Sequence, residues 1–211
     1  MTVVGIVGGI ASGKSAVAEL FRQRGAAVIH ADQIGHEVLD EPDVVQRLRE
    51  RWGDRILGSD GRVSRSAIAS IVFGASPDGP RASPTGGTAE LRFLESATHP
   101  RIEARILQRI AELEHGGTPV IVLDAPILLE VCWERLCDRI YFVEVDREER
   151  LRRALQRGWT AAQFAAREAT QLPLAAKRKV ADQVLDNSAS IDHTLAQIQQ
   201  LWRSLVTTPP E

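Results

Sequence analysis

The sequence predicts an α/β fold, a doubly wound parallel sheet with helices on both faces, and three observations lead to this prediction. Short apolar runs of strand length alternate with amphipathic helical runs along the 211 residues. The first apolar run, residues 3–7, leads into a glycine-rich segment, residues 8–15, and a helix-forming segment follows it. With 44% hydrophobic residues, the chain can bury a full core as a single domain.

Residues 8–15 match the phosphate-binding pattern G-x-x-x-x-G-K-[ST] at every fixed position. Glycines at positions 8, 9 and 13 allow positive φ angles and let backbone N–H groups approach phosphate oxygens. We expect Lys14 to reach the β and γ phosphates of ATP and Ser15 to bind Mg²⁺. The pattern occurs by chance in under roughly 1% of chains of this length, which favours nucleotide binding over an ordinary turn. The expected ATP contacts of the loop are Gly8, Gly9, Ala11, Ser12, Gly13, Lys14, Ser15 and Ala16.

A second buried strand is predicted at residues 26–30, and Asp32 follows it. Ligands of open α/β sheets bind beyond the carboxyl ends of the strands, so Asp32 is a candidate ligand-binding carboxylate. We expect this strand to end beside the phosphate loop. The alternative is that Asp32 is only the N-cap of a helix at residues 33–39.

Residues 40–115 read as mainly helical. Helical spacing of apolar residues between 44 and 52 is followed by a turn at Asp60-Gly61 and a helix at residues 65–73. Seven of the fifteen residues at 74–88 are Gly or Pro, which predicts a mobile surface insertion. Pro100 is expected to end one helix and to open the next. His99 lies at that junction, where it contacts substrate or, as is usual for a lone histidine, is structural.

A strongly apolar strand at residues 119–124 ends in Asp124, a candidate second-shell magnesium residue. After a further strand at 138–145, a helix at 147–157 carries Arg150, Arg153 and Arg157 on one face. These arginines could close over phosphates or could be solvated and paired with glutamates. A second helical arm at 160–170, a short strand at 184–185 and a closing helix complete the predicted fold. The closing helix is expected to bury a face made of Ile191, Leu195, Ile198, Trp202 and Leu205.

Charge and cysteine content exclude several classes. The net charge of −2 and the lack of a long basic run argue against nucleic-acid binding as the main activity. No leader-like segment precedes the first strand, and no apolar run approaches ~18 residues, so we expect a cytoplasmic protein with no membrane contact. Cys132 and Cys137 are expected to be reduced packing thiols. The chain lacks the D-x-x-G and N-K-x-D patterns of GTPases, and its late arginine-rich hairpin suits the lid of a small-molecule kinase.

At this point the sequence resembles the dephospho-coenzyme A kinase family along nearly its whole length. Beyond the phosphate loop, the resemblance rests on motifs whose order and spacing are specific together. They are Ala31-Asp32, His99-Pro100, Pro126-Ile-Leu-Leu-Glu130, Arg153 with Arg157, Arg167 with Gln171, Ala181-Asp182 and Asp186-Asn187.

The resemblance implies a P-loop kinase fold with a helical substrate subdomain and a helical lid in one domain, residues 1–211. It implies phosphorylation of the ribose 3′-hydroxyl of dephospho-CoA by ATP with Mg²⁺, with Asp32 as general base and Asn187 near the adenine of ATP. The implied subregions are a nucleotide-binding core at 1–39, 116–146 and 181–206, a CoA-binding subdomain at 40–115 and a lid at 147–180.

Three residues depart from the family pattern, and two other functions stay open. His30 stands where Asp is usual, Ala11 where Gly is common, and Ala16 where Thr is usual. These three departures leave the details of the magnesium position open. The open alternatives are another small-molecule or nucleotide kinase of the same fold and a noncatalytic ATP-binding sensor.

Overall fold

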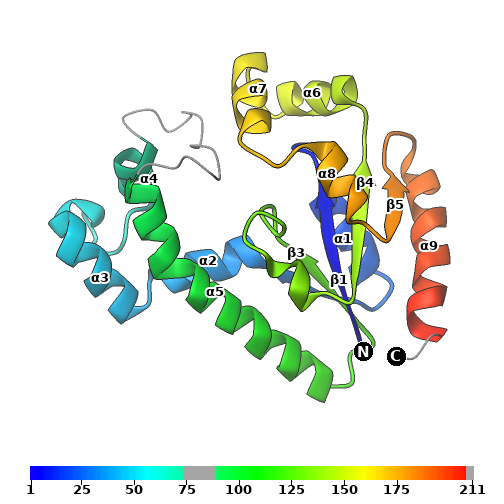
Figure 1. Cartoon of the computed structure of the whole chain (residues 1–211), viewed down its shortest axis with the longest axis horizontal. Coiled ribbons are helices and arrows are strands. Elements are labelled where there is room, and N and C mark those ends of the chain that lie inside the picture. The colour runs from blue at the N-terminus through cyan, green and yellow to red at the C-terminus, as the bar shows by residue number, and fades with distance from the viewer. Residues whose placement is uncertain (74–88, 208–211) are drawn as a thin grey trace.

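The computed structural model describes residues 1–73 and 89–207 and contains a five-stranded parallel sheet between two layers of helices (Figure 1). The predicted insertion at 74–88 lies outside the described residues. The order of the strands in the sheet is β2-β3-β1-β4-β5. The strands are β1 (Thr2–Gly8), β2 (Ala27–His30), β3 (Val120–Asp124), β4 (Arg139–Glu144) and β5 (Gln183–Asp186). The predicted fold class is therefore confirmed.

The central strand β1 is apolar on both faces because it is covered on both. Val3 and Val7 belong to one buried cluster, whereas Val4 and Ile6 belong to the other. Successive side chains of a strand point to opposite faces, so this alternation divides the core into two layers. A continuous apolar run is typical of such a doubly covered parallel strand.

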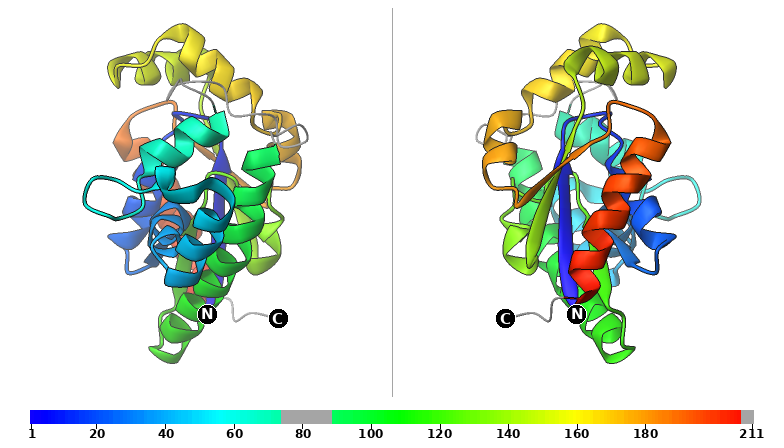
Figure 2. Two further views of the ribbon diagram at one scale, coloured as in Figure 1. Left: turned by 90° about the vertical axis from the view of Figure 1, so that its left-hand side faces the viewer. Right: turned by 90° about the vertical axis from the view of Figure 1, so that its right-hand side faces the viewer.

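Helices of different parts of the chain cover the two faces. The apolar cluster with Val4 includes Val17 of α1 and Ile198 of α9, and Figure 2 shows these two helices together on one side of the molecule. The cluster with Val3 includes residues of α2, α3, α4 and α5. The helices are α1 (Lys14–Arg22), α2 (Ala31–Leu39), α3 (Pro42–Trp52), α4 (Arg65–Phe73), α5 (Ala89–His115), α6 (Arg147–Gln156), α7 (Ala161–Ala169), α8 (Leu174–Lys179) and α9 (Ile191–Thr207), with short 3₁₀ turns at Gly53–Ile56 and Trp133–Leu136.

The predicted break at Pro100 is wrong, because α5 runs through it as one helix of 27 residues. Proline cannot donate to the carbonyl four residues earlier, which is that of Ser96. The guanidinium of Arg47 on α3 lies 3.5 Å from this carbonyl oxygen and supplies the missing donor. Packing of α5 against α2 and α3 further supports the continuous helix.

Three smaller expectations need correction. The six-residue helix α8 was not predicted. Ile191, expected on the buried face of α9, is 55% exposed. Cys137 is half-buried, and burial raises its pKa to about 12, as expected for a packing thiol, but Cys132 is exposed. Within residues 1–73 and 89–207, no helix combines the length and the apolar character needed to cross a bilayer.

Candidate active site

The phosphate loop joins the end of β1 to the start of α1. Gly13 has a φ of 88° at the N-cap of α1, and Ala11 adopts a left-handed φ of 59°, a conformation that suits glycine better. A Cβ on Gly8 would lie 2.7 Å from the backbone oxygen of Val143. Gly9 does not have the positive φ that we expected. A glycine is required at this position for space, because an added Cβ would lie 2.8 Å from Nη1 of Arg150.

Lys14 folds back on the first half of the loop. Its Nζ donates to the carbonyl oxygens of Gly8 at 3.2 Å and Gly9 at 2.9 Å. Burial, followed by the positive charge of Lys177, lowers the pKa of Lys14 from 10.5 to about 8, against the opposing effect of the Asp124 charge. The ammonium is thus poorly compensated by its surroundings, and an anion bound by the loop would stabilise its charged form.

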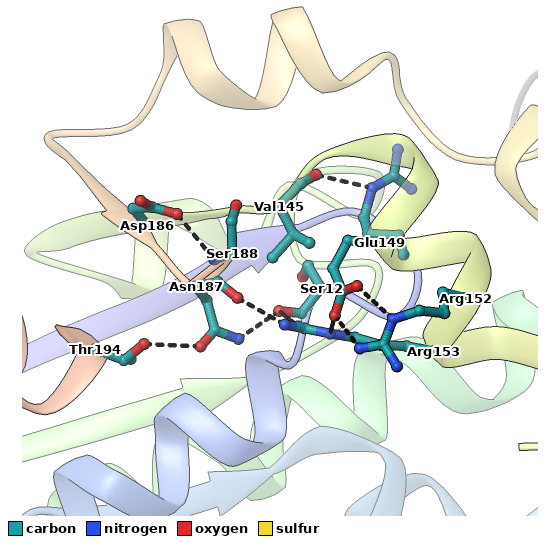
Figure 3. A network of polar contacts seen from close by, with 10 residues as sticks. Ser12, Val145, Glu149, Arg152, Arg153, Asp186, Asn187, Ser188 and Thr194 are labelled. Carbon is teal, nitrogen blue, oxygen red and sulfur yellow. Dashed lines mark hydrogen bonds and ion pairs between the residues drawn. The ribbon is translucent and has the colours of Figure 1, made fainter. Parts of the chain in front are cut away.

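The second half of the loop is braced from two directions (Figure 3). The Asn187 amide nitrogen donates to the Ser12 carbonyl oxygen at 2.8 Å, and Arg153 approaches the same oxygen at 3.4 Å. Arg153 also donates to the Asn187 carbonyl oxygen at 2.8 Å. Gly13 is required beneath this brace, because a Cβ there would lie 2.5 Å from the Asn187 amide nitrogen.

The side chains of the brace are themselves held in place. Thr194 of α9 is fully buried, and its hydroxyl donates to Oδ1 of Asn187 at 3.0 Å. Glu149 accepts from Nε of Arg153 at 2.7 Å, as Figure 3 shows. Both ends of the Asn187 amide are therefore occupied by protein, so this side chain positions the loop. Sequence reasoning missed Thr194, although it lies one helical turn before Ile198 on the predicted buried face.

Two carboxylates lie at the carboxyl edge of the sheet, on different strands. Asp124 ends β3 and is 7% exposed, and Nδ1 of His30 lies 3.3 Å from its Oδ2. Asp124 pairs in register with Ile6 of β1 on one side and with His30 of β2 on the other. We expected β2 to end beside the phosphate loop, but β3 lies between β2 and β1, so Asp124 is on the strand next to the loop.

Asp32 is exposed in the first turn of α2, and the N-cap of this helix is His30. The alternative in which Asp32 is the N-cap is therefore wrong. The N-terminus of a helix carries partial positive charge, which favours an ionised carboxylate at this position. Asp32 is thus a solvent-accessible carboxylate near the same edge of the sheet as Asp124.

The residues present fit a magnesium ion held mainly by water and phosphate oxygens. The Ser15 hydroxyl lies in the first turn of α1, and Asp124 supplies a buried negative charge at the same edge of the sheet. In the described part of the chain, no cluster of three or more His, Cys, Asp or Glu side chains could hold a metal alone. Mg²⁺ at nucleotide sites typically uses only one or two protein ligands, so this set is sufficient.

The three arginines that were predicted on one helix face, Arg150, Arg153 and Arg157, differ in environment. Arg150 is 2% exposed and pairs with Glu168 of α7 at 2.7 Å, while its Nη1 lies 3.4 Å from the Ile10 carbonyl oxygen. It ties the α6–α7 hairpin to the phosphate loop. Arg153 braces the loop, and Arg157 is exposed at the C-cap of α6.

A buried ion pair anchors the segment that returns from the hairpin. Lys177 of α8 and Glu130 lie 2.9 Å apart, with side chains that are 2% and 5% exposed. The backbone N–H of Leu172 also donates to Glu130, at 3.2 Å. Nothing in the periodicity of this short, basic helix marks Lys177 as buried, so sequence reasoning missed it.

His99 lies inside α5 rather than at a helix junction. Its ring centroid is 5.9 Å from that of Trp133, at an interplanar angle of 66°. This edge-to-face contact packs α5 against the turn that follows β3. The contact supports the structural alternative and leaves a substrate role untested.

The comparisons with known proteins agree with this geometry. The family model described as dephospho-CoA kinase matches residues 2–193. A dephospho-CoA kinase from Carboxydothermus hydrogenoformans is 38% identical over 208 residues, covering 96% of this chain and 95% of the relative. The structure of TT1252 from Thermus thermophilus is 29% identical, covers 98% of both chains and has a TM-score of 0.80. A dephospho-CoA kinase structure from Campylobacter jejuni, at 23% identity and a TM-score of 0.65 with 97% of both chains covered, shares the fold.

Proposed function

The chain belongs to the dephospho-CoA kinase family, and we propose that it catalyses the family reaction with Asp32, Lys14 and Arg153 around the phosphate loop. It is a kinase that uses ATP to phosphorylate dephospho-CoA, the final step of coenzyme A biosynthesis. The acceptor atom is the ribose 3′-hydroxyl. The observation that carries the assignment is the family match over residues 2–193, which includes the phosphate loop, Asp32, Asp124 and Arg153. The other small-molecule kinases and the noncatalytic sensor are not favoured.

Lys14 and the loop supply the positive charge and the N–H groups for the donor phosphates. The loop binds the β and γ phosphates of ATP through backbone N–H groups at the start of α1. Lys14 leaves the carbonyl oxygens of Gly8 and Gly9 and stabilises the charge that develops on the transferring phosphoryl group. Ser15 and Asp124 would hold Mg²⁺, and the ion would neutralise phosphate charge when bound.

Asp32 orients the acceptor hydroxyl and accepts its proton. An alcohol is a weak nucleophile, and an accessible carboxylate within hydrogen-bond reach increases its reactivity. Residues 40–115 bind the remainder of dephospho-CoA, where His99 is a candidate contact, and residues 147–180 form the lid. Arg157, exposed at the end of α6, contacts the phosphates when the lid closes. Asn187 supports the loop near the adenosine part of ATP, and the reaction takes place in the cytoplasm.

An acceptor panel tests this function. The protein with ATP and Mg²⁺ is incubated with dephospho-CoA, AMP or shikimate, and products are analysed by mass. We expect one phosphoryl group to be added to dephospho-CoA and little to the others. Phosphorylation of another acceptor in preference to dephospho-CoA contradicts the proposal, and nucleotide binding without transfer to any acceptor supports a sensor.

Thr194→Val is expected to raise the KM for ATP about fivefold. Valine keeps the shape of the buried side chain but cannot donate to Asn187, whose hold on the Ser12 carbonyl then weakens. The loss of one such hydrogen bond costs about 1 kcal/mol, which corresponds to about a fivefold change in an equilibrium constant. Steady-state kinetics at varied ATP measure the effect, and Thr194→Ser, which retains the hydroxyl, is the matched control. Equal KM values for the valine and serine variants contradict a positioning role.

A further inference from the structure

A cavity of about 560 Å³ lies between the phosphate loop, the end of β4 and the segment that returns from α7 to α8. Its volume is in the range of small-molecule sites, roughly 300 to 1,000 Å³. Its apolar walls come from three parts of the chain that are distant in sequence. These wall residues are Ile10, Phe142, Val145, Leu172, Pro173 and Leu174.

The charges around this cavity cancel. It is lined by three arginines and three acidic residues, and each arginine is paired with an acidic residue of the lining. The pairs are Arg147–Glu168, Arg150–Glu168 and Arg178–Glu144. A phosphate group in this cavity would find no uncommitted guanidinium, so the cavity suits an uncharged ligand group with an apolar surface.

Besides the exposed carboxylate of Asp146, one polar side chain of the lining is available to a ligand. The Gln171 side-chain amide has no hydrogen-bond partner within residues 1–73 and 89–207, while its backbone N–H donates to Glu168. The next residue, Leu172, is fixed by Glu130, and Glu130 is in turn held by the buried Lys177. The position of Gln171 is therefore set before a ligand binds, which lowers the entropic cost of recognition.

The cavity lies on the same face of the sheet as α2, the helix that carries Asp32. Phe142 and Leu174 belong to the apolar cluster that includes residues of α2 and α5, whereas α1 and α9 cover the other face. Asp32 is on α2, and the cavity includes Gly9 of the phosphate loop. A ribose held between Asp32 and the loop would carry its base on the same face of the sheet.

From this arrangement, and resting on the proposed function, we propose that the cavity binds the adenine base of the acceptor dephospho-CoA and that Gln171 reads its edge. The Gln171 amide oxygen accepts from the exocyclic amine, and its NH₂ group donates to an adjacent ring nitrogen. The pantetheine arm is also uncharged, but the diphosphate separates it from the ribose that carries the reacting hydroxyl. The base is attached to that ribose directly, and the phosphate loop borders the cavity, so the base is the part of the acceptor that we place there.

The test compares dephospho-CoA with its hypoxanthine analogue in the wild-type enzyme and in Gln171→Leu. Hypoxanthine carries an oxygen where adenine has its amine, so the wild type should show about a tenfold higher KM for the analogue. Gln171→Leu should raise the KM for dephospho-CoA about tenfold, bring the two acceptors to nearly equal KM, and leave the KM for ATP unchanged. The control is Gln200→Leu, which replaces an exposed glutamine of α9 and should behave as wild type.

Other outcomes overturn the proposal in distinguishable ways. Equal increases in KM for both acceptors assign the cavity to the pantetheine arm, and an increase in the KM for ATP assigns it to the adenine of ATP. A lower melting temperature with unchanged KM values makes Gln171 a structural residue. If the wild type phosphorylates neither acceptor, the proposed function itself fails, whereas turnover by a wild type that does not discriminate between them contradicts only the adenine assignment.

Discussion

Replacement of Lys14 by alanine is expected to reduce phosphoryl transfer below detection while the fold remains intact. In the proposed reaction the ammonium lies at the β and γ phosphates, and interactions that stabilise transferring phosphoryl groups contribute several kcal/mol to catalysis. Its only hydrogen bonds within the described residues are to the Gly8 and Gly9 carbonyl oxygens, so its loss removes little from the core. Coupled measurement of ADP release and the melting temperature check both parts. Lys179→Ala, at an exposed lysine of α8, is the control, and normal turnover of Lys14→Ala would contradict the assignment.

The same lysine should make ATP binding depend on pH. The pKa of Lys14 is about 8 without ligand, and bound phosphates favour the charged form, so its pKa rises in the complex. Binding above pH 8 therefore takes up a proton, and the Kd for ATP should increase by up to about tenfold per pH unit above this value. Calorimetry at pH 8.5 in two buffers of different ionisation enthalpy measures the uptake. Lys14→Ala should show less uptake, and identical uptake in both proteins would assign the proton to another group.

Asp32→Asn is expected to lower turnover with dephospho-CoA by at least roughly 10²-fold, with little change in ATP affinity. Asparagine retains the size and one acceptor of the side chain but cannot take the proton of the hydroxyl, and general base catalysis typically contributes about 10²- to 10⁴-fold. Rapid quench of a single turnover measures the chemical step separately from product release. Asp40→Asn, at the other end of α2, is the matched control.

Two results would reassign Asp32. A parallel loss of ATP affinity and turnover would place Asp32 at the metal, as would rescue by a different divalent ion. Unchanged turnover would leave it as a surface carboxylate whose charge favours the start of α2. Asp32 and Asp40 are both exposed, so Asp32→Asn and Asp40→Asn should fold normally. A loss of activity in Asp32→Asn then reports on the chemical step.

Much of the fold could be predicted because local patterns determine it. Apolar runs placed the strands within one or two residues, and the predicted helix at 65–73 agrees with α4. The order of the strands was less accessible, because the insertion of β3 between β1 and β2 depends on pairing between distant segments. Pro100 is a second example of a contact between distant segments. Local rules predict a helix break there, but Arg47 of α3 donates to the carbonyl oxygen that Pro100 leaves without a donor.

The site divides in a similar way. The phosphate loop was predictable because its backbone conformation requires particular residues at fixed spacing. Spacing alone could not separate Arg150 from Arg153, since only their partners Glu168 and Asn187 distinguish them. Lys177 and Leu172 both contact Glu130, which lies 42 or more residues earlier in the chain, and no local pattern records such contacts.

The central position of β1 in the sheet also has a consequence for how the protein folds as it is synthesised. This strand is made first, but its neighbours in the sheet are β3 and β4, so Val4 pairs with Val122 and Arg139. Ribosomes add about 5 to 20 residues per second, so the apolar strand β1 stays unpaired for on the order of ten seconds until β3 is synthesised. Pairing across such sequence separation is also intrinsically slow after release. We therefore expect the nascent chain to depend on chaperones that bind short apolar segments, and β1 to be the segment they bind.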